Sequence, residues 1–239
     1  MVEKGQHDSL TPLRFLANNV QRISTSKLLR LIYKKPNFDE PYVYFPLHVS
    51  NDFKISVMVP EFSDQFYVAH LCAANLPVGY RLYVKEHPSF VGGEAFSDLK
   101  RLAGADRIVL VPPETSSRSL IQRAAAVAVI SSSAGLEGLF YEKSIVTFGR
   151  PIYAGLGLTF DVSDLTQTAQ ILKMAVSTPF TNREKLFQFL HAMMRTTYPG
   201  RPPVNIQTEE NLYRVAEALR QKLKDILGDQ TCDMGEVGS

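Results

Sequence analysis

Short runs of β-forming residues alternate with helical patterns through the middle of the chain, and this alternation most constrains the fold. The runs lie at residues 42–47, 80–86, 107–111, 126–130 and 144–148, and each is rich in Val, Ile, Tyr or Leu. Helical patterns occupy residues 61–75, 93–103, 116–125 and 134–142. Strands that alternate with helices in this way pair in parallel. We therefore predict an α/β fold, with a Rossmann-like parallel sheet and helices on both of its faces.

The regions on either side of this alternation predict further divisions of the chain. Residues 1–40 have apolar residues at near-helical spacing and basic residues on the opposite face, which predicts a basic helical arm or linker. The Rossmann-like domain then covers residues 41–163. Three helical patterns follow within residues 164–227, with Asp164 capping the first, and we expect these helices to pack on that domain. The small, polar residues 228–239 predict a disordered tail.

Charge and apolar content limit the partners. Lys and Arg number 26 against 24 Asp and Glu, and a net charge of +2 is too small for nucleic acid to be the main partner. The longest apolar run, residues 124–130, is far shorter than the roughly 20 residues that span a bilayer. Two cysteines and no stretch of the signal-peptide type favour a reducing compartment, so we expect a cytoplasmic protein. The basic face of residues 1–40 is favoured as a solvated face; the alternative is peripheral contact with the inner face of the plasma membrane.

Polar residues follow the predicted strands at the edge where ligands of such sheets bind, beyond the carboxyl ends of the strands. "FPLHVSND" follows the first strand, "VKEHPSF" the second, and "ISSSAGLE" the fourth. These junctions supply most of the candidate substrate-binding residues, namely His48, Lys85, His87, Pro88, Ser131, Ser132, Ser133 and Glu137.

The three serines lie between a strand and a helix, where free backbone N–H groups and the positive helix end attract an anion. A single capping serine would explain one hydroxyl, not three. Glu137 does not complete a capping box, because the positions three residues after the serines hold Ala, Gly and Leu. Its carboxylate either complements the helix dipole or accepts hydrogen bonds from a sugar diol. We favour an anion site with Glu137 as a ligand contact.

The histidines indicate phosphate binding rather than metal binding. His87 ends a strand on the edge that carries the serines, where an imidazole could donate to a phosphate oxygen; the alternative is a structural hydrogen bond. His48 is a weaker element of the same kind. The five histidines are scattered without metal-ligand spacing, and no dinucleotide, Walker or G-x-S-x-G motif is present. We expect no metal and no cofactor.

Three stretches, "YVYFPLHVSNDFKI", "LYVKEHP" and "VISSSAGLEGLFYEKSIVTFGRPIY", follow one another over residues 42–153. In this order and spacing they resemble the capsule polysaccharide biosynthesis proteins, bacterial glycosyltransferases that add Kdo from CMP-Kdo to a phospholipid-linked acceptor. The resemblance implies the C-terminal, donor-binding half of a GT-B fold.

The resemblance also assigns roles to the candidate residues. It implies that His87 and Pro88 contact the donor phosphate, as do the three serines, above all Ser132 and Ser133. Glu137 would bind the ribose hydroxyls. The loop at residues 112–115, with Glu114 and Thr115, falls where such folds seat the nucleobase.

The chain departs from the family at its N-terminal side. A GT-B transferase needs an acceptor domain of about a hundred residues or more, which in this family supplies the acidic general base, and about forty residues precede the first strand here. We expect the donor-binding half of a longer enzyme, a chain completed by a partner domain or chain, or a binding protein without catalysis. A nucleotide-sugar epimerase is a further alternative. The chain by itself is expected to bind CMP-Kdo without transferring sugar to a lipid-linked saccharide acceptor; the catalytic residue stays unassigned.

Overall fold

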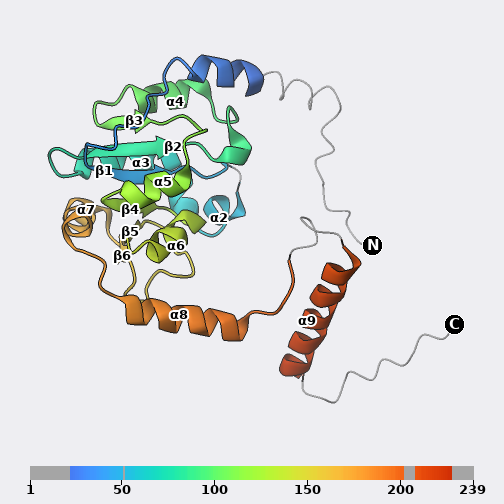
Figure 1. The fold of residues 1–239 in the computed structure, drawn as a ribbon. Coiled ribbons are helices and arrows are strands. Elements are labelled where there is room, and N and C mark those ends of the chain that lie inside the picture. Colours follow the sequence, from blue (N-terminus) through green and yellow to red (C-terminus); the bar gives the residue numbers. More distant parts are fainter. Residues whose placement is uncertain (1–21, 51, 202–207, 228–239) are drawn as a thin grey trace. The chain divides into compact units, whose positions relative to one another are not determined.

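The computed structural model describes residues 22–50, 52–201 and 208–227 (Figure 1). The first 21 residues of the predicted arm and the predicted disordered tail lie outside the described residues. Residues 22–29 of the arm are helical.

Six parallel strands form one sheet in the order β3-β2-β1-β4-β5-β6, which confirms the predicted Rossmann-like fold (Figure 1). All five predicted strands are present. The sixth strand, β6, is two residues long and was not predicted, because so short a segment has no recognisable alternation. The strands are β1 (Tyr42–Pro46), β2 (Arg81–Lys85), β3 (Ile108–Leu110), β4 (Ala126–Val129), β5 (Ser144–Thr147) and β6 (Phe160–Asp161).

Helices cover both faces of this sheet (Figure 1). One face carries α3 (Gln65–Asn75), α4 (Phe96–Ala103) and α7 (Thr168–Ser177). The other carries α5 (Ser117–Arg123) and α6 (Ser133–Phe140). The remaining elements are α2 (Phe53–Ser56), α8 (Arg183–Thr196), α9 (Glu209–Leu227) and the 3-10 turns η1 (Pro60–Phe62), η2 (Pro88–Phe90) and η3 (Leu165–Gln167).

Local capping explains where two helices begin. The predicted start at residue 61 is wrong, since Asp64 accepts a hydrogen bond from the Tyr67 N–H at 2.9 Å and α3 begins only at Gln65. Asp164 caps the short turn η3 by accepting from the Thr166 N–H at 2.8 Å, and α7 follows that turn. Asp164 was predicted as a cap and does cap, but it caps the turn η3 instead of the helix α7; the Asp64 cap was not predicted.

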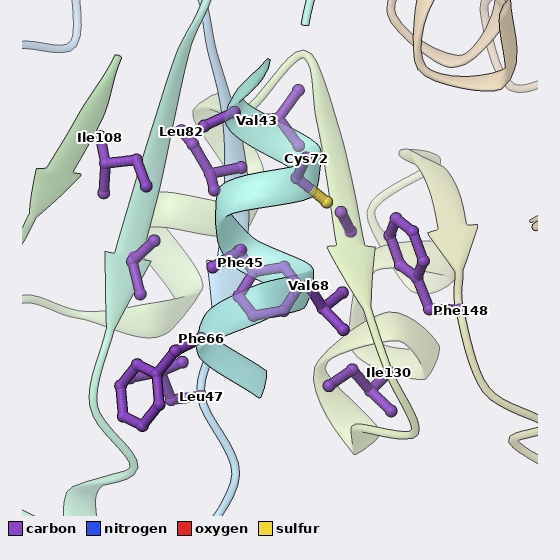
Figure 2. Packing of buried hydrophobic residues seen from close by; sticks show 14 of the residues in the cluster. Val43, Phe45, Leu47, Phe66, Val68, Cys72, Leu82, Ile108, Ile130 and Phe148 are labelled. Atoms are coloured by element: carbon purple, nitrogen blue, oxygen red, sulfur yellow. The ribbon is translucent and has the colours of Figure 1, made fainter. Parts of the chain in front are cut away.

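The two faces of the sheet differ in chemistry. On the face of α3 the core is apolar; Figure 2 shows Val43 and Phe45 of β1 gathered with Val68 and Cys72 of α3. Burial raises the pKa of the Cys72 thiol, which makes it a packing residue rather than a reactive one.

The opposite face contains buried tyrosines. Tyr42 and Tyr83 stack with ring centroids 4.2 Å apart, and the Tyr42 hydroxyl donates to the Leu120 carbonyl of α5 at 2.7 Å. The Tyr83 hydroxyl donates to the Asn37 carbonyl at 2.8 Å. These hydroxyls are buried with partners, as buried polar groups require, and they tie α5 and the segment before β1 to the sheet.

The chain divides into two compact units, the first ending at Leu186 and the second beginning at Phe187. The first unit contains the whole sheet, and α7 belongs to it because this helix packs against α3 and β5. In the second unit, the Asn211 side chain accepts from the Arg201 N–H and donates to the Arg201 carbonyl at 2.8 and 2.9 Å. Among the described helices, none combines the length and apolar character needed to cross a bilayer.

Candidate functional site

The sheet has a switch point between β1 and β4. These strands are neighbours, but β1 connects onward to β2 on one side and β4 to β5 on the other, so the loops after them diverge. Ligands of such sheets bind in the crevice that this divergence opens. The loop after β1 carries His48, and the loop after β4 carries the three serines, which we call the serine loop (residues 131–133).

His48 and the serine loop meet across this switch point. The backbone N–H of Ser131 donates to Nε2 of His48 at 3.3 Å. The His48 side chain is buried, and Gln65 fixes its backbone, since Gln65 Oε1 accepts from the His48 N–H at 2.7 Å. The structure thus places His48 as a support of the serine loop. Sequence reasoning missed Gln65, which shows no signal beyond being a polar residue at the start of a helix.

The serine loop begins α6 and leaves two hydroxyls available. Ser132 is the N-cap, and its Oγ accepts from the Ala134 N–H at 3.2 Å. Among the described residues, the Ser131 and Ser133 hydroxyls have no hydrogen-bond partner. Capping therefore accounts for one of the three serines, and the other two hydroxyls lie at the positive end of a helix.

Tyr153 holds the serine loop from its other side. Its hydroxyl donates to the carbonyl of Ser132, and its ring packs where a Cβ on Gly135 would be, 2.8 Å from Cζ. Burial raises the pKa of the Tyr153 hydroxyl, so it stays a neutral donor. Tyr153 was not among the predicted site residues, although it ends the "RPIY" segment after the fifth strand, in the last of the three stretches that resemble the family.

His87 lies in the exposed loop after β2, with Pro88 opening the turn η2. Nδ1 of His87 accepts from the Ser89 N–H at 3.2 Å. In a neutral imidazole whose Nδ1 accepts, Nε2 carries the proton. His87 therefore offers an exposed N–H donor, the group that a phosphate oxygen needs.

Residues of the N-terminal arm hold this loop. Arg22 donates to the carbonyls of Ser89 and Val91 at 3.2 and 3.4 Å, and its guanidinium lies 5.5 Å from the Phe90 ring centroid. The buried carboxylate of Glu86 accepts from the Gly92 N–H at 3.0 Å and from the Tyr33 hydroxyl. Burial raises the pKa of Glu86, while these two hydrogen bonds oppose the rise.

Lys85 is buried at the end of β2 and holds the loop after β3. Its Nζ donates to the Thr115 carbonyl at 2.6 Å and to Ser117 Oγ at 2.8 Å. Burial lowers the pKa of Lys85, and the charge of Glu114 opposes this. Glu114 itself is exposed in the loop. Lys85 thus anchors the loop at residues 112–115, and its role as a direct ligand contact stays a prediction.

Glu137 contributes to the electrostatic environment of Tyr44. Burial raises the pKa of the Tyr44 hydroxyl to about 12; a hydrogen bond with Ser117 opposes the rise, and the Glu137 carboxylate adds to it. Tyr44 lies in β1 on the face that α5 and α6 cover. The half-buried Glu137 therefore lies within electrostatic range of Tyr44, which is hydrogen-bonded with Ser117 of α5, and its side chain is not part of the N-cap of its own helix. Within the described ranges, no three His, Cys, Asp or Glu residues gather as metal ligands.

The sequence of this chain is similar to those of known proteins. A family model described as "Capsule polysaccharide biosynthesis protein" matches residues 3–194. The capsule polysaccharide modification protein LipA of Neisseria meningitidis serogroup B is 34% identical over 91 residues, which are 36% of this chain and 13% of LipA. LipA of serogroup A is 33% identical over 91 residues. The chain thus matches a small part of the length of these relatives.

Solved structures give distant likenesses. The beta Kdo 2,4 transferase KpsC of Thermosulfurimonas dismutans is 22% identical, with a TM-score of 0.45 over 72% of this chain and 55% of that one. The UDP-GlcNAc 2-epimerase of Methanocaldococcus jannaschii is 11% identical, with a TM-score of 0.38 over 76% of this chain and 52% of that one.

Proposed function

Because the chain belongs to the capsule polysaccharide biosynthesis protein family, we propose that it is the donor-binding half of a GT-B glycosyltransferase. The enzyme would transfer a sugar such as Kdo from CMP-Kdo to a lipid-linked saccharide acceptor. One observation supports the assignment of this half: the serine loop, with two unpartnered hydroxyls among the described residues, lies at the switch point of the sheet and is fixed there by His48.

The donor phosphate would bind at the start of α6. The hydroxyls of Ser131 and Ser133 and the positive helix end stabilise its charge, and Nε2–H of His87 donates to one of its oxygens. In the transfer, an acceptor hydroxyl oxygen bonds to the anomeric carbon of the sugar while the bond from that carbon to the phosphate oxygen breaks. Negative charge grows on the departing CMP, where these donors act most strongly.

The nucleoside would lie toward α5. Glu137 accepts hydrogen bonds from the ribose hydroxyls, and the loop anchored by Lys85 contacts the base with backbone groups of Glu114 and Thr115. The proton of the acceptor hydroxyl must pass to a base, which we assign to a partner domain or partner chain.

Calorimetry tests the nucleotide site. We expect CMP to bind more tightly than UMP or AMP. His87→Ala or Ser131→Ala/Ser133→Ala, which keep the Ser132 cap, should weaken CMP binding by about 1–3 kcal/mol without lowering the melting temperature. Ser97→Ala, on the exposed surface of α4, is the matched control. Equal or absent binding of all three nucleotides would remove the base assignment; variants that unfold would make the residues structural.

A second experiment separates binding from transfer. The 239-residue chain should bind CMP-Kdo but release no CMP when a lipid-linked acceptor is added, until an acceptor domain or partner chain is supplied. Release of CMP with sugar transfer by the chain alone would mean that a carboxylate such as Asp39, Glu40 or Asp52 acts as the base.

We also propose that the protein acts in the cytoplasm and contacts the inner face of the plasma membrane through the basic residues of 1–40. Cosedimentation with phosphatidylglycerol vesicles should exceed that with phosphatidylcholine vesicles and fall with salt. Lys27→Gln/Arg30→Gln should weaken it. Equal binding to both vesicles would leave the arm as a solvated face.

A further inference from the structure

A cavity of about 490 Å³ opens beside the serine loop, and none of the residues assigned above to the nucleotide lines it. Its walls come from η1, from the segment after β5 and from the end of β6. Each of these segments lies at the carboxyl edge of the sheet, since η1 is in the connection from β1 to α3. The volume falls within the range of small-molecule sites.

The cavity and the serine loop share one wall. The Gly149 N–H donates to the Ile130 carbonyl at 2.9 Å, directly before Ser131, and a Cβ on Gly149 would lie 2.6 Å from that oxygen. Further along, Tyr153 reaches Ser132 while its neighbours Ala154 and Gly155 face the cavity. A group joined to a phosphate on the serine loop therefore starts next to this cavity.

Aromatic rings form the apolar wall. Phe62 of η1 and Phe148 after β5 meet edge to face, with centroids 6.2 Å apart and ring planes at 69°. Phe148 is buried, whereas Phe62 keeps part of its surface exposed. Such a wall suits the apolar face of a sugar ring.

Some polar side chains of the cavity have hydrogen-bond partners within the protein, whereas others remain available to a ligand. The Asp161 carboxylate is occupied, because it accepts from Thr147 and Thr159 at 2.5 Å and from the Gly155 N–H at 2.8 Å. Arg150 is exposed, and its guanidinium forms no ion pair or hydrogen bond within the described part of the chain. Glu61 is also exposed at this cavity. A cation and a carboxylate thus remain for a ligand.

We propose that this cavity is a subsite for a carboxylated sugar, whose carboxylate pairs with Arg150 while its ring lies on Phe62. A hydroxyl of the ring donates to Glu61. Two sources fit this chemistry: the sugar carried by the nucleotide, or the terminal unit of the saccharide acceptor. Which of the two sources supplies the sugar rests on the proposed function. The recognition of a carboxylated sugar by the cavity does not depend on that function.

Free sugars test the recognition itself. Saturation-transfer NMR with the methyl glycoside of Kdo should show binding to the unmodified chain, whereas methyl glucoside should not bind. Arg150→Ala should lower the affinity for the Kdo glycoside about tenfold, and Phe62→Ala should lower it as well. Arg101→Ala, an exposed arginine on α4, is the matched control. No binding of the Kdo glycoside, equal binding of the neutral sugar, or an unchanged Arg150→Ala variant would overturn the proposal.

Calorimetry with CMP, CMP-Kdo and a Kdo-terminated oligosaccharide identifies the source. If the donor sugar occupies the cavity, Arg150→Ala lowers the affinity for CMP-Kdo about tenfold and leaves the affinity for CMP unchanged. If the acceptor occupies the cavity, the variant lowers the affinity for the oligosaccharide and leaves the affinity for CMP-Kdo unchanged. If Arg150→Ala lowered the affinity for CMP as much as that for CMP-Kdo, the cavity would belong to the nucleotide site, and the proposal of a separate subsite would be overturned. Failure of the unmodified chain to bind CMP would refute the proposed function, while the free-sugar result would still decide the subsite.

Discussion

Ser131 and His48, which are 83 residues apart in the chain, are joined by a hydrogen bond of 3.3 Å from the Ser131 N–H to Nε2 of His48. The bond crosses the point where the loops after β1 and β4 diverge. Gln65 holds the other end, since its Nε2 donates to the His48 carbonyl at 3.2 Å and its Oε1 accepts from the His48 N–H. The first residue of α3 thus helps to place a loop on the opposite side of the switch point.

We expect His48→Ala to lower the free energy of unfolding by about 1–3 kcal/mol, because it leaves the buried Ser131 N–H without an acceptor. It should also weaken CMP binding severalfold by loosening the serine loop. His48→Gln, which keeps an acceptor, should recover part of both losses. Urea unfolding and calorimetry measure the two effects; unchanged CMP affinity in His48→Ala would show that the loop keeps its position without this bond.

Arg22→Ala should loosen the loop that carries His87. Arg22 donates to two carbonyls of this loop, so hydrogen exchange of residues 87–92 should accelerate while that of the sheet stays constant. CMP affinity should fall a few fold. The control is Arg30→Ala, an exposed arginine of the same arm. Identical exchange in the two variants would argue against the role of Arg22.

Glu94 predicts a pH dependence of stability. Burial raises the pKa of its carboxyl, the hydrogen bond from Ser50 opposes this, and the charges of Glu86 and Asp98 add to the rise. A carboxyl with a raised folded-state pKa contributes stability that is fully present below its unfolded pKa and is lost as pH rises through the folded pKa. Relative to Glu94→Gln, the unmodified chain should therefore gain unfolding free energy as pH falls toward the ordinary Glu pKa of about 4.3. Urea titrations at several pH values measure this difference; parallel curves for the two proteins would contradict it.

Gly135→Ala should destabilise the start of α6. The added Cβ would overlap the Tyr153 ring, which is itself fixed by its bond to Ser132, so a cost of about 1–3 kcal/mol is expected. Gly104→Ala is the control, because its Cβ would come no closer than 3.3 Å to another atom. Thermal unfolding compares the two; similar melting temperatures would mean that Tyr153 moves aside freely.

The sequence predicted those features that depend on neighbouring residues. Runs of β-forming residues marked five strands, and the spacing of Glu137 excluded a capping box, in agreement with the Ser132 cap on Ala134. Because the alternation of strands and helices predicts parallel strands, the junctions with polar residues were also expected at one edge of the sheet.

Contacts between distant segments could not be predicted in this way. A lysine at a strand end is visible in the sequence, but the bonds of Lys85 to Thr115 and Ser117 depend on how the next loop folds back. From the sequence, Arg22 was interpreted as part of a solvated basic face. Its hydrogen bonds to Ser89 and Val91 depend on where the arm lies in the fold. The cavity at Arg150 likewise depends on three separate segments, η1, the segment after β5 and the end of β6, coming together around it.

The tyrosines next to the site provide a spectroscopic signal for its occupation. The chain has ten Tyr and no Trp, so its near-ultraviolet absorption is mainly a tyrosine signal. The Tyr44 hydroxyl is hydrogen-bonded with Ser117 and feels the charge of Glu137, two groups that a nucleotide would disturb. Tyrosine fluorescence, corrected for the exciting light that the nucleotide base absorbs, can therefore report occupation of the site without a label, and Tyr44→Phe would identify how much of that signal comes from this one ring.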